Sequence, residues 1–236
     1  MGLRGPSDRK SSGGTIMSAA ANGSPAAAAE FPRAEALLEV LRDVISLWHQ
    51  LDPAPDSWTA AQKAMPAART GWAELAERIQ LINTFQWHEE DRSRAHGAGD
   101  EVLAAVKRSI DASNARRVKA VEIFDAHVDA SLAEAGLANP EAPLHSESSG
   151  SIVDRMSVLM LKVWHVAEGM ESAADASARS ALASRLAGLE EQVADLGKCL
   201  DRLFADVAAG RMRVKLYRQV KVYRDPTTDS YRSDLD

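Results

Sequence analysis

The chain has little cysteine, few aromatic residues and no long apolar run, and each shortage excludes a class of protein. The single cysteine, Cys199, can form neither an intrachain disulfide nor a cysteine-based metal cluster, which indicates a reducing compartment. No uninterrupted apolar stretch reaches the roughly 20 residues that span a bilayer. The net charge of -6 argues against a general nucleic-acid binder. We therefore expect a cytoplasmic protein without a membrane span.

Residues that favour strands are also scarce, whereas alanine is abundant. Aromatic residues make up 5% of the chain, and glycine and proline are rare inside the periodic segments. Apolar residues recur at helical spacing in five long segments, and a shorter segment over residues 57–70 is interrupted at Pro66. This pattern predicts an all-α fold, an antiparallel bundle of four to five long helices. The long segments cover residues 33–52, 71–95, 100–134, 151–169 and about 178–208.

The two ends of the chain differ in composition from the helical part. Residues 1–30 are rich in Gly, Ser and Ala and are predicted to be disordered, and Met17 is an equally good translation start. Residues 31–226 are predicted to form a single domain, followed by a disordered tail over residues 227–236. Residues 211–224, here called the basic arm, hold six basic residues and no acidic one. Three readings are open for this short arm: solvated, folded onto acidic groups of the bundle, or in contact with a phosphate-bearing partner.

Several local signals predict where the helices begin and end. Asp100 is the expected N-cap of the third long helix, because an acid suits the positive end of the helix dipole. Ser151 and Asp154 have the spacing of a capping box at the start of the central helix, which would give Asp154 a purely local role. Gly210 fits the C-terminal cap of the last helix.

The clearest functional signal is a set of polar residues on helix faces that should be packed. Asn83 and Glu90 continue the apolar stripe of residues 71–95, and Arg117 interrupts the stripe of residues 100–134. Because buried charges must be paired or neutralised, we expect these groups to meet beside the central helix. The predicted ligand-binding set is Asn83, Gln86, Glu90, Asn114, Arg117, Asp154, Arg155, Lys162 and His165.

Three interpretations of this polar set remain open. It is either a structural network that fixes helix register, a cavity for a small polar, anionic or hydroxylated ligand, or an acid–base site with Glu90 or His165 as the catalytic candidates. The short connection near residue 97 makes its two helices antiparallel neighbours. We therefore expect Asn83 to lie nearer than Glu90 to the level of Arg117, with Glu90 facing Lys107 or a base of the central helix.

The sequence contains three Trp-His dipeptides, and each histidine is followed three residues later by a carboxylate residue. They are Trp48-His49 with Asp52, Trp87-His88 with Asp91 and Trp164-His165 with Glu168. Residues three apart are neighbours on a helix, so each pair offers two ligands to zinc, manganese or iron. Against this, His88 lies about 160° from the centre of its helix's apolar stripe, which favours histidines at helix edges with solvated acids. The metal-ligand candidates are His88, Asp91, His165 and Glu168, and no cofactor is specified.

Five motifs in this order carry a resemblance to a known family. The chain resembles the bacterial family designated domain of unknown function 4254 over about residues 35–226. The family has no assigned reaction, so the resemblance implies an architecture and motif positions, with a weak link to cell-surface glycan pathways. The motifs are NTFQWHEEDRSR (residues 83–94), DASNARR (111–117), SESSGSIVDRMSVLMLKVWH (146–165), LEEQVADL (189–196) and KLYRQVKVYRDP (215–226).

Three hypotheses for function follow from these patterns. The first is a small-ligand-binding or accessory protein that holds a polar molecule beside the central helix. The second is a metal-dependent helical-bundle enzyme that uses the His and carboxylate pairs as ligands, with Glu90 as a base. The third is an oligomeric structural protein, a homo-oligomer whose polar network sets helix register.

Overall fold

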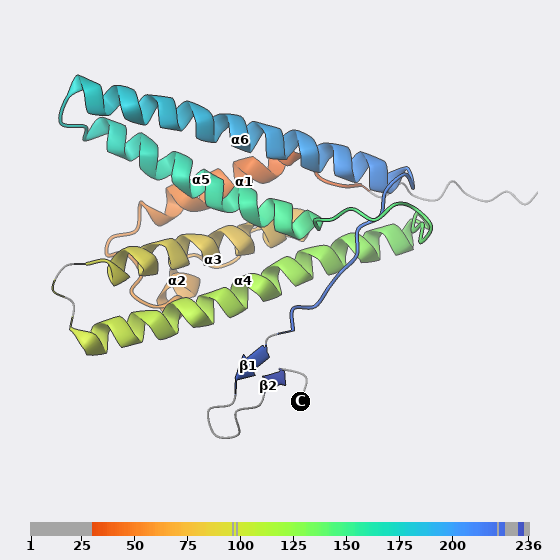
Figure 1. Ribbon diagram of the computed structural model, residues 1–236, viewed down its shortest axis with the longest axis horizontal. Helices are drawn as coiled ribbons and strands as arrows, with labels where there is room; N and C mark the ends of the chain where they lie inside the picture. Colours follow the sequence, from red (N-terminus) through yellow and green to blue (C-terminus); the bar gives the residue numbers. More distant parts are fainter. Residues whose placement is uncertain (1–29, 96, 98, 221, 225–230, 234–236) are drawn as a thin grey trace, which may run out of the picture.

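The computed structural model describes residues 30–95, 97, 99–220, 222–224 and 231–233. Residues 1–29, predicted to be disordered, lie outside this part of the chain. The described residues are mainly helical, which confirms the predicted all-α class (Figure 1). Their elements are α1 (Ala34–Trp48), α2 (Trp58–Ala64), α3 (Gly71–Ser93), α4 (Asp100–Glu134), α5 (Ser149–Glu171), α6 (Ala176–Ala208), β1 (Val222–Arg224) and β2 (Tyr231–Ser233).

The five long helices form a bundle that contains two antiparallel pairs of neighbouring helices. α4 runs antiparallel to α3 after a short turn, and α6 runs antiparallel to α5 (Figure 1). α1, α3 and α5 run in the same direction, because α2 and its flanking loops return the chain from the end of α1 to the start of α3. The C-terminal parts of these three helices therefore lie at one end of the bundle. None of the described helices is long and apolar enough to cross a membrane.

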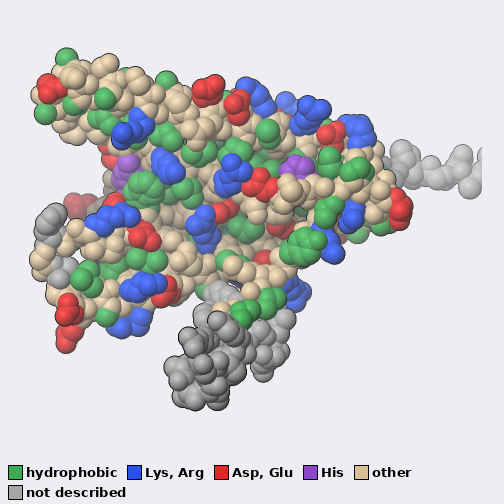
Figure 2. Space-filling model, in the orientation of Figure 1, with side chains coloured by type: hydrophobic (Ala, Val, Ile, Leu, Met, Phe, Trp, Pro, Cys, Tyr) green, Lys and Arg blue, Asp and Glu red, His purple; other side chains and the backbone are tan. Residues whose placement is uncertain are grey.

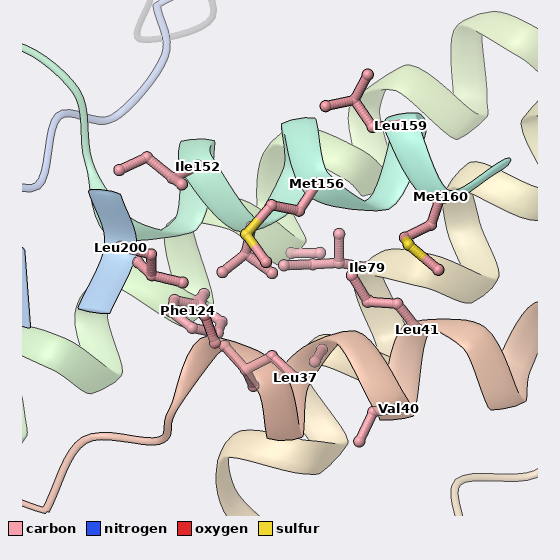
Figure 3. Packing of buried hydrophobic residues seen from close by; sticks show 14 of the residues in the cluster. Leu37, Val40, Leu41, Ile79, Phe124, Ile152, Met156, Leu159, Met160 and Leu200 are labelled. Atoms are coloured by element: carbon pink, nitrogen blue, oxygen red, sulfur yellow. The ribbon is translucent and has the colours of Figure 1, made fainter. Parts of the chain in front are cut away.

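The central position of α5 explains why its sequence is apolar on more than one face. Its buried Ile152, Met156 and Met160 face side chains from all four other long helices (Figure 3). Burial of one such side chain contributes about 1.5–3 kcal/mol. The partners shown there are Leu37 and Leu41 of α1, Ile79 of α3, Phe124 of α4 and Leu200 of α6.

Two predicted helix caps were wrong, and one was right. Gly99 rather than Asp100 is the N-cap of α4, and Asp100 is instead the first helical residue. α5 begins two residues earlier than expected, because the Ser148 hydroxyl accepts the Ser151 backbone N–H at 3.2 Å and so caps the helix. Asp154 therefore lies beyond the cap and is free to bind other groups. Gly210, with φ of +67°, follows α6 in the left-handed conformation expected of a C-terminal cap.

The basic arm lies along the bundle for most of its length. Its Arg213 pairs with the loop before α5, where the His145 backbone N–H donates to the Arg213 carbonyl at 2.8 Å. Further along, the Gln219 backbone N–H donates to Glu122 of α4 at 3.0 Å. Beyond residue 220, β1 pairs antiparallel with β2 (Figure 1). β2 lies inside the segment predicted to be a disordered tail, and the rest of that segment lies outside the described residues.

Candidate functional site

Asp154 of α5 is the centre of a polar network between three helices. Arg117 of α4 binds both of its carboxylate oxygens: Nε donates to Oδ1 at 2.8 Å and Nη2 donates to Oδ2 at 2.6 Å. Asn83 of α3 donates through Nδ2 to Asp154 Oδ1 at 2.9 Å and to Ser157 Oγ at 2.9 Å. Asn83, Arg117 and Asp154, all members of the predicted set, are therefore in direct contact.

Arg117 and Asp154 form a two-point ion pair within this network. Two parallel hydrogen bonds between a guanidinium and a carboxylate are stronger than neutral ones and fix the geometry of the pair. The hydrogen bond to Asp154 raises the pKa of the Arg117 guanidinium. The Arg117 side chain is 33% exposed and that of Asp154 is 12% exposed, so this ion pair has one side in the core and one side toward solvent.

Of the other predicted ligand-binding residues, some lie near the Asp154 network and others point to solvent. Gln86 donates to the side-chain oxygen of Asn114 at 2.9 Å, so these two residues adjoin the Asp154 network. Arg155, by contrast, turns to solvent and pairs with Glu147 at 2.9 Å, and Lys162 is exposed. Both lie about 80–100° around α5 from Asp154, which turns them away from the network.

Glu90 does not meet the base that was predicted for it. It pairs with Arg94 on its own helix at 3.7 Å and its side chain is 39% exposed, while Lys107 pairs with Asp111. The buried carboxylate at this level is Glu89, which is 3% exposed and pairs with Arg92. Sequence reasoning missed Glu89, although it continues the helical spacing of buried Ile82 and Phe85.

A cavity of about 730 Å³ opens beside the Asp154 network, between α4, the start of α5 and the basic arm. Its wall combines two amides, hydroxyls, paired charges, an imidazole and one phenol ring. Basic and acidic side chains alternate over this face of the molecule (Figure 2). The cavity is lined by Asn114, Arg117, Val118, Val121, Glu122, Asp125, His145, Ser146, Glu147, Ser148, Ser151, Asp154, Lys215, Tyr217, Arg218 and Gln219.

The crossing of α4 and α5 holds the cavity wall in place. The Gly150 backbone N–H donates to Asp125 Oδ1 at 2.7 Å, and burial raises the pKa of the Asp125 carboxyl. A Cβ at Gly150 would lie 2.8 Å from the Val121 carbonyl oxygen, closer than real contacts allow. Glycine therefore permits the approach of the two helices one turn before Asp154. A second cavity, of about 210 Å³, lies on the α3 side of Arg117 and includes Glu90 in its wall.

The three Trp-His dipeptides meet at the end of the bundle where α1, α3 and α5 finish. The ring centroids of His49, His88 and His165 lie 5.1 to 5.6 Å apart, and one ring nitrogen from each lies within 4.8 Å of the others. We call these residues the three-histidine cluster.

Each histidine of the cluster stacks on a tryptophan from a different helix. The Trp48 and His88 ring centroids are 5.4 Å apart, those of Trp164 and His49 are 5.0 Å apart, and those of Trp87 and His165 are 5.2 Å apart. The interplanar angles of 10°, 25° and 6° show near-parallel rings. Each dipeptide therefore contributes one histidine to the cluster, and its tryptophan stacks on the histidine of another dipeptide.

Hydrogen bonding orients two of these rings. His49 Nδ1 donates to the Ile45 carbonyl oxygen at 2.8 Å, and His165 Nδ1 bonds the Glu168 carboxylate at 2.8 Å. The Nε2 atoms of His49, His88 and His165 are buried, and none has a hydrogen-bond partner among the described residues. Burial, and next the nearby His49 and His165, lower the pKa of His88 to about 4, so His88 is neutral at pH 7.

The predicted metal candidates are only partly brought together. His88 and His165 are neighbours, whereas Asp91 binds Arg94 and Glu168 binds His165 at the surface. The acids are thus solvated as expected, but the histidines are covered. The edge position predicted for His88 did not account for the tryptophans of other helices. His49 was missing from the candidates, although its dipeptide repeats the pattern of the other two.

Comparison with known proteins supplies a family and no reaction. No curated protein sequence and no solved structure matches the chain. The family model described as a protein of unknown function, DUF4254, matches residues 73–216, more than half of the 236 residues. The match includes the whole Asp154 network and two residues of the three-histidine cluster, while His49 precedes it. The chain belongs to the DUF4254 family.

Proposed function

We propose that the protein binds a small polyhydroxylated molecule, of the size and kind of a sugar or sugar acid, in the cavity beside the Asp154 network. One observation carries the proposal: Asn114, Arg117 and Asp154 of the predicted ligand-binding set line a single cavity of about 730 Å³. Sites for small molecules commonly have volumes of about 300–1,000 Å³ and a few convergent polar groups.

The chemistry of the wall favours hydroxyl groups over a multiply charged ligand. The carboxylates are already engaged: Asp154 by Arg117, Glu147 by Arg155 and Asp125 by a backbone N–H. Such fixed acceptors and donors can each exchange a hydrogen bond with a hydroxyl without leaving a charge unpaired.

The basic arm adds groups that suit a sugar or a sugar acid. Tyr217 is 67% exposed, and Lys215 Nζ lies over its ring, 5.0 Å from the centroid, so the opposite face of the ring is offered to the C–H face of a sugar. Lys215 and Arg218 line the same wall and would bind a single acid group on the ligand. A sugar ligand would agree with the implied link to glycan pathways. The proposal places the protein in the cytoplasm, where its free, exposed Cys199 stays reduced.

Ligand-observed NMR with the full chain tests the proposal. A panel of neutral sugars, sugar acids and sugar phosphates is screened for saturation transfer from the protein. We expect hits among the first two groups, and we expect Asn114→Leu or Tyr217→Ala to weaken them by at least about tenfold, the cost of one lost hydrogen bond or aromatic contact. Tyr217 is exposed, so Tyr217→Ala should leave folding intact, and thermal unfolding of Asn114→Leu checks that loss of its bond from Gln86 leaves the fold intact.

Gln50→Leu provides the matched control, since it removes an exposed amide on the end of α1, away from the cavity lining. It should leave every hit unchanged. A panel without hits, or hits that all three variants bind like the wild type, would show that the cavity does not take hydroxylated ligands.

A further inference from the structure

We propose that the three-histidine cluster is a binding site for one divalent transition-metal ion, of which zinc is the representative. The site is distinct from the proposed ligand cavity, none of whose lining residues belongs to the cluster. The inference therefore does not rest on the proposed function.

The histidines of the cluster direct nitrogen lone pairs into the protein, where no described residue pairs with them. A carbonyl or carboxylate oxygen can only accept, so the Nδ1 of His49 and of His165 carries the proton. Their Nε2 atoms therefore hold free lone pairs in the neutral tautomer. The buried Nε2 atoms of His49 and His165 are acceptors without a donor among the described residues, and an unsatisfied buried acceptor costs about 1–3 kcal/mol. His88 Nε2 is buried without such a partner too, and it becomes a third acceptor when His88 carries its proton on Nδ1. A metal ion would satisfy all three at once.

The distances between the histidine nitrogens are close to those of a metal site. Metal–nitrogen bonds of about 2.1 Å with tetrahedral angles place the nitrogens about 3.4 Å apart. The ring nitrogens here lie within 4.8 Å of one another, so each has to move inward by less than about 1 Å. Small side-chain rotations provide that movement, since each ring is only partly buried.

The groups around the cluster favour a cation and orient the histidine rings. His49 is the C-cap of α1, where the helix dipole is negative. The Glu168 carboxylate behind His165 is the partner that metal-bound histidines commonly have, and the Ile45 carbonyl serves His49 in the same way. Asp91 and Glu168 also act on His88 through their charge, each in the sense that favours a nearby positive charge.

The donor set indicates the class of site. Structural zinc sites are usually closed by four protein ligands, whereas three histidines with a fourth position for water are typical of catalytic zinc. Among the described residues, the group of clustered ligand atoms contains these three histidines alone. A bound ion would therefore keep an open position, and its water would be acidified toward neutral pH.

Calorimetric titration of zinc into chelator-treated full chain tests the proposal, with cobalt absorption as a second readout of coordination geometry. We expect one zinc ion per chain. His88→Phe and His165→Phe keep an aromatic ring against the tryptophans but remove a ligand. Each should lower the affinity for zinc at least about 100-fold. His127→Phe is the matched control, because His127 is an exposed histidine that packs on Trp72 outside the cluster, and it should bind zinc like the wild type.

Glu168→Gln keeps the test decisive if a histidine variant fails to fold. Its side chain is half exposed, so folding should be unaffected, yet loss of a partner behind a ligand weakens metal affinity by about 10- to 100-fold. Two results would overturn the site: wild-type protein that takes up no zinc, or uptake that neither the histidine variants nor Glu168→Gln weaken. Either would show that the cluster is held by aromatic packing or a bridging water instead.

Discussion

At the scale of single residues, Asp154 brings α3, α4 and α5 together, because its carboxylate accepts from both Arg117 and Asn83. Such a group is expensive to leave without its charged partner, and this asymmetry makes the network testable. The pair of Arg155 with Glu147 provides the comparison, since it also joins an arginine to a carboxylate but is more exposed, with side-chain exposures of 56% and 30%.

Arg117→Ala is expected to lower the free energy of unfolding by about 2–3 kcal/mol, because Asp154 keeps only a neutral donor in a mostly buried position. Arg155→Ala should cost less than about 1 kcal/mol, as exposed ion pairs do. Urea denaturation midpoints measure both. Equal midpoints for the two variants would mean that the Asp154 pair is no more protected from water than the surface pair.

The Asp125 carboxyl gives a prediction about pH. Burial raises its pKa above 3.8, so its contribution to stability is complete below that pH and is lost as the pH rises through the folded-state pKa. Asp125→Asn does not titrate there and can still accept from the Gly150 N–H. The stability of the variant relative to wild type should therefore increase as the pH rises from about 4 to 7. Denaturation curves across this range would refute the prediction if the difference stayed constant.

Single residues could be predicted from the sequence where a polar group interrupts an apolar stripe. Asn83 and Arg117 stand out for this reason, and the structure brings them together. Arg155 and Lys162 could not be sorted in the same way, because α5 is apolar on more than one face and its exposed strip is narrow. Glu90 continues an apolar stripe in the same way, but it is partly exposed and pairs with Arg94 at the end of α3.

At the scale of elements, the crossing of α4 and α5 depends on one glycine. A methyl group at Gly150 would meet the Val121 carbonyl and Asp125 at less than 3 Å. Gly150→Ala should destabilise the protein by about 1–3 kcal/mol through overpacking, despite the better helix propensity of alanine.

Gly188→Ala in α6 is the control, because a Cβ there has no neighbour within 4 Å. It should stabilise the protein by up to about 1 kcal/mol through helix propensity alone. Thermal unfolding of both variants checks the pair. A Gly150→Ala protein as stable as Gly188→Ala would show that the helices separate at no cost.

Helix existence was predictable from the sequence, while exact starts and contacts between helices were not. The period of apolar residues marks each long helix, and Pro66 ends α2 as expected. The start of α5 was misplaced because Ser148 and Ser151 both have capping side chains, and only the folded loop selects Ser148. The convergence of His49 with His88 and His165 depends on α1 running parallel to α3 and α5, which no local pattern states.

At the scale of the whole molecule, two polar sites occupy different parts of one bundle. The cavity lies where α4, the start of α5 and the basic arm meet, and the three-histidine cluster lies where α1, α3 and α5 end. Between them α5 packs its apolar side chains against the other long helices (Figure 3). Homo-oligomerisation, expected for a structural protein, stays a prediction.

Methyl NMR of the full chain during titration with the strongest hit of the sugar panel tests the ligand cavity most directly. Val118 and Val121 line the cavity, whereas Val44 lies in a separate apolar cluster with Trp48 and Phe85. We expect saturable shifts of the Val118 and Val121 methyl signals, with Val44 unchanged. Shifts confined to residues outside the cavity lining, or saturable binding that leaves both valines unmoved, would contradict it.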